Sequence, residues 1–198
     1  FKNMSGGTLE NRILILDDED SIVELLGNYL TSKGYDCTLT TSPFDALEFL
    51  KQEKFALLLT DLRMPKMNGI EVVRQAKEID PDIAVVVVTA LMEINNAVQA
   101  MRVGADDYVL KPFNLSEIAL SVSRAFEKRR LILENRAYQQ ELARRVEEAT
   151  QNLERVNREL LATKQYLENL LNSTVDGIIT IDPNRKINYA NKGAHRML

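Results

Sequence analysis

Runs of apolar residues recur in the first half of the chain, and each stops abruptly at a polar side chain. The runs cover residues 13–16, 57–59, 83–88 and 108–110, with a less apolar one at 36–40. Near-continuous Val, Ile and Leu are typical of parallel strands that are covered on both faces. Helix-length segments separate the runs, and this alternation predicts an α/β fold with a doubly wound, five-stranded parallel sheet.

The residues between these runs carry the expected helix signals. Ser42 followed by Pro43 is typical of a helix N-cap and first turn. Gly34 and Gly104 stand where helices should end. The run Asp36–Thr40 is the least apolar of the five, so we expect an edge strand there and the sheet order 2-1-3-4-5.

A single long helix is predicted after the last of these strands. Asn114 and Glu117 resemble a capping box, and neither Gly nor Pro occurs from there to Leu171. An apolar pattern with alternating spacings of four and three then runs through Leu142, Val146, Ala149, Leu153, Val156, Leu160, Thr163, Leu167 and Leu170. This heptad pattern predicts a parallel dimeric coiled coil.

Two features refine the expected coiled coil. Glu159 at a g position and Lys164 at the next e position could pair between the two chains. The alternative is a long amphipathic helix folded back on its own domain, but the other helices already supply both layers of that domain.

Upstream of Leu142, the apolar position is Tyr138 rather than the heptad-consistent Gln139. This stutter leaves two possible seams between about residues 131 and 142.

The pattern changes again after residue 172. A strand-like segment ends at Asp182, a Pro183-Asn184 turn follows, and a second strand-like segment ends at Asn191. The segment resembles the opening of a PAS sensor domain, in which a helix follows this Asn. Because an isolated hairpin is marginally stable in water, residues 173–198 should need a partner.

Four of the predicted strands bring polar side chains to one edge of the sheet. Carboxyl ends of parallel strands share an edge, where ligands of open α/β sheets bind. The residues expected to converge there are Asp17, Asp18, Asp61, Thr89 and Lys111. Three ionised carboxylates at close range raise one another's pKa unless cations compensate them. The expected ligands are oxygen atoms, with no His or Cys nearby, and this favours Mg²⁺ as the second cation besides Lys111.

The residues around this edge form five motifs in order. They are Asp17-Asp18, Asp61 before Met64-Pro65, Asn68-Gly69, Thr89-Ala90, and Tyr108-Val109-Leu110-Lys111-Pro112-Phe113. Together they resemble a response-regulator receiver domain of two-component signalling over about residues 11–130. The resemblance implies phosphorylation by a histidine kinase or a phosphotransfer protein.

The resemblance also implies roles for single residues at this edge. Asp61 is the implied phosphoacceptor, and Lys111 pairs with it and then with a phosphoryl oxygen. Asp18 is expected to bind Mg²⁺ directly and Asp17 through water, with Asp61 and the backbone carbonyl of Arg63 completing the ligands. The alternative for the paired acids is that they only cap the next helix.

Two further residues match the parts of the family that respond to phosphorylation. On phosphorylation, the Thr89 side chain should move so that its hydroxyl contacts the phosphoryl group, and Ala90 leaves room for that movement. Tyr108 matches the switch aromatic, although a tyrosine on an edge strand can equally serve packing. The family holds the peptide bond that corresponds to Lys111-Pro112 in the cis form.

Composition narrows the possible functions. The net charge of -4 gives no electrostatic footprint for nucleic acid, and no run is apolar enough for a membrane span. The single cysteine, Cys37, fits a reducing, cytoplasmic setting. His195 is the only histidine, so the long helix cannot carry the phosphodonor of a histidine kinase.

We therefore predict a receiver domain at 11–130, a coiled-coil linker at 131–171 and an N-terminal PAS-like fragment at 172–198. The expected function is to accept a phosphoryl group and to relay the signal through the dimer to the PAS-like part and an output beyond it. One alternative is the N-terminal part of a signalling enzyme, such as a hybrid histidine kinase or a cyclic-dinucleotide synthase, with its catalytic domain beyond residue 198. The other is a degenerate receiver that serves as a scaffold.

Overall fold

The computed structural model describes residues 11–90 and 94–197. Residues 91–93 and 198 belong to the expected domains but lie outside this description. The chain divides into two compact units, residues 1–136 and 137–198. The domain limits expected near residues 130 and 171 stay predictions, because this division does not address their functional boundaries.

The first unit alternates strands and helices along the chain. The elements are β1 (Arg12–Leu16), α1 (Asp20–Ser32), β2 (Asp36–Thr40), α2 (Pro43–Gln52), β3 (Leu57–Asp61), α3 (Gly69–Ile79), β4 (Ala84–Ala90), α4 (Ile94–Val103), β5 (Asp107–Lys111) and the start of α5 (Leu115–Ser173). The five strands pair in parallel in the order β2-β1-β3-β4-β5, which confirms the predicted topology and the edge position of β2.

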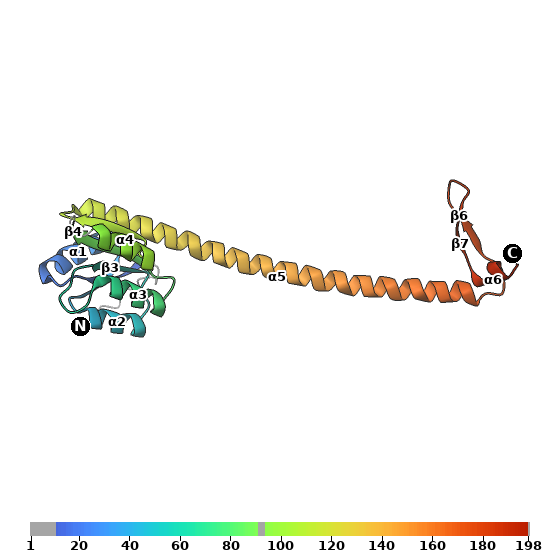
Figure 1. The fold of residues 1–198 in the computed structure, drawn as a ribbon, viewed down its shortest axis with the longest axis horizontal. Helices are drawn as coiled ribbons and strands as arrows, with labels where there is room; N and C mark the ends of the chain where they lie inside the picture. The colour runs from blue at the N-terminus through green and yellow to red at the C-terminus, as the bar shows by residue number, and fades with distance from the viewer. Residues whose placement is uncertain (1–10, 91–93, 198) are drawn as a thin grey trace. The chain divides into compact units, whose positions relative to one another are not determined.

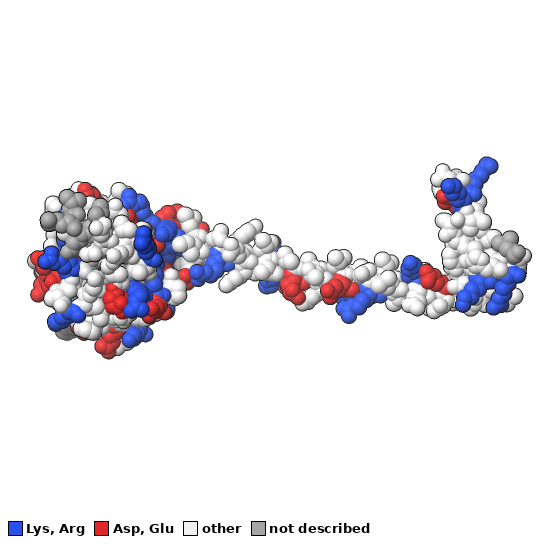
Figure 2. Space-filling view, viewed as in Figure 1, with Lys and Arg blue, Asp and Glu red and all other residues white. Residues whose placement is uncertain are grey.

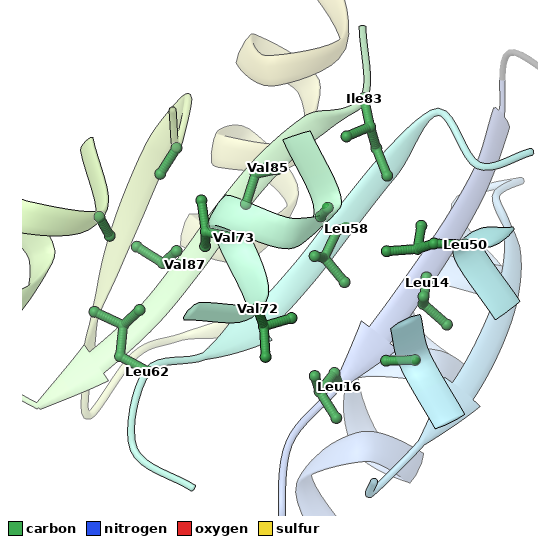
Figure 3. Packing of buried hydrophobic residues seen from close by; sticks show 14 of the residues in the cluster. Leu14, Leu16, Leu50, Leu58, Leu62, Val72, Val73, Ile83, Val85 and Val87 are labelled. Carbon is green, nitrogen blue, oxygen red and sulfur yellow. The ribbon is translucent and has the colours of Figure 1, made fainter. Parts of the chain in front are cut away.

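Helices cover both faces of this sheet (Figure 1). One core lies between the sheet and α2, α3 and α4, and Figure 3 shows Leu58 and Val85 of the strands beside Val72 and Val73 of α3. The second core lies between the sheet and α1 and α5, with Leu26 and Ile118 fully buried. Since both faces are buried, β1, β3 and β4 are apolar along most of their length, as the sequence indicated.

Local signals define the ends of these helices as expected. The Ser42 hydroxyl caps α2 by accepting from the backbone N–H of Asp45 at 3.3 Å. Gly34 and Gly104 adopt φ values of +94° and +119°, in the left-handed region that glycine tolerates. The Asn114 side chain accepts from the N–H of Glu117 at 2.9 Å and so caps the start of α5.

Helix α5 is continuous for 59 residues. Its first turns are packed in the second core through Ile118, Val122 and Ala125. The seam residues farther along are exposed on the single chain, with Leu153 68% and Leu160 64% accessible. One unbroken helix was predicted and is confirmed. None of the helices in the described part of the chain has the length and apolar character needed to cross a membrane.

The second unit ends in a short hairpin followed by a helix. These elements are β6 (Ile179–Ile181), β7 (Ile187–Ala190) and α6 (Lys192–Met197), with β6 and β7 antiparallel as predicted. The Asp182 carboxylate stabilises the turn, because its Oδ1 accepts from the backbone N–H groups of Asn184 at 2.8 Å and Lys186 at 2.9 Å.

Two asparagines join this hairpin to the end of α5. The fully buried Asn191 donates from Nδ2 to the Leu171 carbonyl at 2.8 Å, and its Oδ1 accepts from the N–H of Ile178 at 2.8 Å. Asn172 of α5 in turn accepts from the N–H of Lys192 at 2.9 Å. Each asparagine therefore satisfies a backbone group at the end of the other's helix. The hairpin gains the partner that its small size requires.

Candidate functional site

The polar residues that follow the strands meet at one edge of the sheet. The register pairs Leu16 with Thr60 and Ala90 with Lys111, so β1, β3, β4 and β5 end at nearly the same level. Lys111 is the last residue of β5 and Asp61 the last of β3. The sheet topology thus brings Lys111 close to Asp17, which is 94 positions away in the chain, and to Asp61, which is 50 positions away.

The Lys111 ammonium lies between two buried carboxylates. Its Nζ donates to Asp61 Oδ2 at 2.6 Å and to Asp17 Oδ2 at 2.9 Å. Burial by itself would lower the pKa of Lys111, but the hydrogen bonds to Asp61 and Asp17 outweigh it and the pKa is raised. Lys111 is therefore held in its charged form in this pocket.

The carboxylates outnumber this cation. Asp17, Asp18 and Asp61 each place one oxygen within 4.8 Å of the others, with Asp17 and Asp61 buried and Asp18 exposed. Burial raises the pKa of Asp17 above its ordinary value, although Lys111 acts in the opposite direction. Three carboxylates and one ammonium leave negative charge without a partner among these four groups. This arrangement fits a hard divalent cation such as Mg²⁺.

Backbone groups hold the two buried carboxylates in place. Asp61 Oδ1 accepts from the N–H of Arg63 at 3.1 Å, and Asp17 Oδ1 accepts from the N–H of Glu19 at 3.0 Å. The N-cap of α1 is Glu19, which makes no side-chain capping bond. The geometry of Asp17 is therefore set by the pocket as well as by the turn that precedes α1.

Thr89 is fully buried at the end of β4, and its hydroxyl has no hydrogen-bond partner among the described residues. An unsatisfied buried hydroxyl costs free energy, so a group that arrives near it gains a ready donor. Tyr108 lies at the other expected switch position, on the edge strand β5, and is 40% exposed. The Lys111-Pro112 peptide bond is cis, as the resemblance implied.

The loop after Asp61 returns to the strand that it leaves. The N–H of Gly69 donates to the Leu62 carbonyl at 2.9 Å, and Asn68 caps α3 by accepting from the N–H of Ile70 at 3.0 Å. A β-carbon on Gly69 would meet the backbone of Asp61 and Leu62. Asn68-Gly69 was recognisable from the sequence as a motif without a role, whereas no sequence signal singled out Asn172.

Comparison with known proteins agrees with this geometry. The family model described as response regulator receiver domain matches residues 13–123, more than half of the chain. The chain belongs to the response regulator receiver family. A model described as PAS domain matches residues 165–198, so the start of a PAS domain follows the receiver.

Individual relatives extend this comparison. The regulatory protein AtoC of Escherichia coli (strain K12) is 35% identical over 69% of this chain and 30% of its own length. The crystal structure of a CheY-like receiver domain protein from Methanospirillum hungatei JF-1 shares 28% identity over 61% of this chain and 96% of that chain, with a TM-score of 0.58. A structure described as adenylate cyclase from Rhodopirellula baltica shares 28% identity over 63% of this chain and 93% of that chain, with a TM-score of 0.60.

The match to the curated relatives is partial in length. The chain spans 28% to 36% of the first three of them.

Proposed function

We propose that the receiver accepts a phosphoryl group on Asp61 from a histidine kinase or a phosphotransfer protein. The observation that carries this proposal is the position of the Asp61 carboxylate, buried at the sheet edge and 2.6 Å from the Lys111 ammonium. A nucleophilic carboxylate next to a fixed cation is the arrangement that phosphoryl transfer needs, because catalysis there depends on positioning and charge neutralisation. Membership of the receiver family supports the same role.

The transfer exchanges one bond to phosphorus for another. An oxygen of Asp61 attacks the phosphorus of the donor phosphohistidine, the P–N bond breaks, and the imidazole leaves with the electron pair and takes up a proton. Lys111 Nζ stabilises the charge on a phosphoryl oxygen, since it is held at the site by Asp17 as well as by Asp61. The phosphoryl group then accepts a hydrogen bond from the Thr89 hydroxyl, which makes none to the described residues. Tyr108 on the neighbouring strand responds to the movement of Thr89.

Mg²⁺ is the cation that this donor set fits. Asp17, Asp18 and Asp61 would hold it, with the backbone carbonyl of Arg63 beside them, because Arg63 already contacts the Asp61 carboxylate through its N–H. When bound, Mg²⁺ neutralises the carboxylates and the incoming phosphoryl oxygens.

Phosphorylation of the isolated chain tests this site. With Mg²⁺ and acetyl phosphate, the wild-type chain should gain one acyl phosphate, detected by intact mass and lost in hydroxylamine. Asp61→Asn should gain none, since an amide oxygen is a poor nucleophile. Asp45→Asn, which changes an acid in the first turn of α2, serves as the matched control and should be labelled like the wild type. Equal labelling of Asp61→Asn would refute the assignment.

We infer that the signal leaves the receiver through a parallel dimer of α5. The heptad residues form an exposed apolar stripe on the single chain, with Leu153, Leu160 and Leu167 all more than half accessible. Charged side chains of both signs lie between white patches along this helix in Figure 2. Such a stripe needs a covering surface, and its heptad period fits a second copy of the same helix.

Light scattering tests the dimer. Leu153→Asp combined with Leu160→Asp should yield a monomer, because it places charges in the seam, while Asp61 should still be phosphorylated. Leu161→Asp is the matched control: Leu161 is 57% exposed but lies outside the predicted seam, and this variant should stay dimeric. A dimer that survives the double substitution would have to be held by other surfaces.

A second candidate function places this receiver in a signalling enzyme. The observation that favours it is the likeness of the receiver-sized part of this chain to a structure described as an adenylate cyclase. The receiver could relay its signal to a PAS-like part and a further output, or to a catalytic domain such as a kinase or a cyclic-dinucleotide synthase. Measuring the output activity of the full-length protein distinguishes these two cases. Loss of the output signal in Asp61→Asn would support either form of control.

A further inference from the structure

Helix α5 is tied to the base of the receiver beyond its buried turns. Arg129 Nε donates to the Asp82 carbonyl at 2.8 Å, and Arg136 NH1 donates to both Asp82 carboxylate oxygens at 2.8 Å each. One residue before Arg129, Lys128 Nζ lies 3.0 Å from Asp106 Oδ1. We call the contacts of Arg129 and Arg136 with Asp82 the brace.

The groups that receive these contacts are themselves fixed. Asp82 follows Pro81 in the turn before β4, and its N–H donates to Asp80 Oδ1 at 3.0 Å. Asp106 accepts from the N–H of Val85 at 2.9 Å and pairs with Lys77 at 3.1 Å. The brace therefore joins α5 to a well-connected part of the sheet base rather than to a loose loop.

The brace defines which side of α5 faces the receiver. Arg129 and Arg136 are seven residues apart and so lie on one side of the helix. Ile132, between them, lies on that side and lines a small hollow together with Asp82. Leu131 lies two residues after Arg129, about 200° around the helix, and therefore on the opposite side. Leu131 is 52% exposed and Ile132, beside the hollow, is 45% exposed.

The same geometry sorts the residues of the next turn. Tyr138 comes two residues after Arg136 and shares the outward side with Leu131, seven residues before it. Gln139 comes seven residues after Ile132 and shares the side of the brace. Of the two seams that the sequence leaves open, one begins on the free side of α5 and the other begins against the receiver.

We propose that a second copy of this chain docks on the Leu131–Tyr138 side of α5, and that the brace keeps the Ile132–Gln139 side closed to it. The proposal rests on the dimer put forward above and specifies its register. Packed helices have axes about 8–10 Å apart, so a helix over Ile132 would need the space that the base of the receiver fills. A second copy is the occupant because the stripe continues with heptad period and because Glu159 and Lys164 are complementary at g and e positions.

This choice has a consequence for the coiled coil. The seam through Leu131 and Tyr138 joins the downstream heptads at Leu142 with the stutter, which unwinds the supercoil locally. The uninterrupted heptad through Gln139 becomes available only when the pair between Asp82 and Arg136 is broken. The brace is then the element that selects between two packings of one helix.

Cysteine cross-linking of the full chain tests the proposal. In a Cys37→Ser background, Leu131→Cys, Ile132→Cys, Tyr138→Cys and Gln139→Cys are made in separate proteins and oxidised across the dimer. Cross-linking at residues 131 and 138 should exceed that at 132 and 139. Adding Asp82→Ala should lower this preference by about two- to fivefold, the effect of a surface ion pair. Glu78→Ala, which removes a partner of Arg74 on α3, is the matched control and should leave the preference unchanged.

The outcomes separate this proposal from the dimer itself. A dimer by light scattering that cross-links better at 132 and 139 overturns the proposed side while the dimer stands. A monomer overturns both. If Asp82→Ala fails to fold, Arg136→Gln replaces it in the test, because it removes the helix partner of the same ion pair. An unchanged preference in whichever of these variants folds would show that the brace does not select the seam.

Discussion

A β-carbon placed on Gly69 would lie 2.3 Å from the backbone oxygen of Asp61. It would also lie 2.5 Å from the Cα of Leu62, and both are backbone atoms that cannot turn away as a side chain could. Gly69 is not among the residues with positive φ, so its requirement is one of space alone. The start of α3 thus lies directly against the strand end that carries the proposed phosphoacceptor.

Gly69→Ala should therefore disturb both the site and the fold. Displacement of the Asp61 backbone should weaken Mg²⁺ binding by about tenfold, which corresponds to 1.4 kcal/mol. The free energy of unfolding should fall by about 1–3 kcal/mol, as in other overpacked positions. Gly27→Ala is the control, because its β-carbon would meet only the side chain of Leu39 at 2.7 Å. Mg²⁺ titration of both variants should weaken only Gly69→Ala, and equal affinities would contradict this role.

Asp17→Asn should stabilise the metal-free receiver. Because burial raises the pKa of Asp17 above 3.8, the folded protein binds this proton more tightly than the unfolded chain does. Its stability contribution is therefore lost as pH rises above that value. Removing the charge should raise the free energy of unfolding at neutral pH by up to about 2 kcal/mol.

The same substitution should remove the stabilisation that added Mg²⁺ gives to the wild type. Thermal unfolding with and without Mg²⁺ measures both effects, and Asp36→Asn, at the exposed start of β2, is the control. A large Mg²⁺-dependent shift that persists in Asp17→Asn would mean that Asp17 is not part of the metal site.

Thr89→Val should also stabilise the unphosphorylated receiver. The buried Thr89 hydroxyl has no partner in the described part of the chain, so replacing it with a methyl group of similar shape should raise the free energy of unfolding by about 1 kcal/mol. Thr89→Ser retains the hydroxyl and should show no such gain. With beryllofluoride as a phosphoryl mimic, the wild type should be stabilised more than Thr89→Val. An equal response of the two would show that the hydroxyl does not contact the phosphoryl group.

Asn191→Ala should loosen the hairpin without affecting the receiver. The substitution removes the acceptor of the Ile178 N–H, at a cost of about 1–3 kcal/mol for an unsatisfied buried group. It also removes one donor to the Leu171 carbonyl, to which the Thr174 hydroxyl still donates. Hydrogen exchange of the β6 and β7 amides should then accelerate by about tenfold or more. Asn184→Ala, at the exposed turn between β6 and β7, is the control. Unchanged exchange in Asn191→Ala would show that the hairpin is held by other contacts.

Much of the site could be predicted because its signals are local. Each apolar run marks a strand whose two faces are buried. The polar residues that end these runs mark one common edge of the sheet. Asp17, Asp61, Thr89 and Lys111 were found in this way, and their proximity follows from parallel strand pairing alone. The 59-residue length of α5 was predictable for a similar reason, since a helix continues until a residue stops it.

The requirement at Gly69 could not be predicted from such signals. It depends on how closely α3 approaches β3, and the spacing of residues does not encode that distance. The link between Asn172 and Asn191 likewise joins the ends of two helices across a hairpin. In both cases the chain folds back on itself, and the partner is chosen by three-dimensional packing.

The order of the strands, the convergence of the acids on Lys111 and the two possible seams of α5 could all be predicted from the sequence. Each of these follows from periodicity or from the ends of elements, which are properties of neighbouring residues. The side of α5 that is held against the receiver depends on the tertiary fold, because Arg129 and Arg136 bind Asp82 across 47 and 54 residues of chain. A helical repeat specifies the positions that share a face, but the surface that covers that face comes from the rest of the fold.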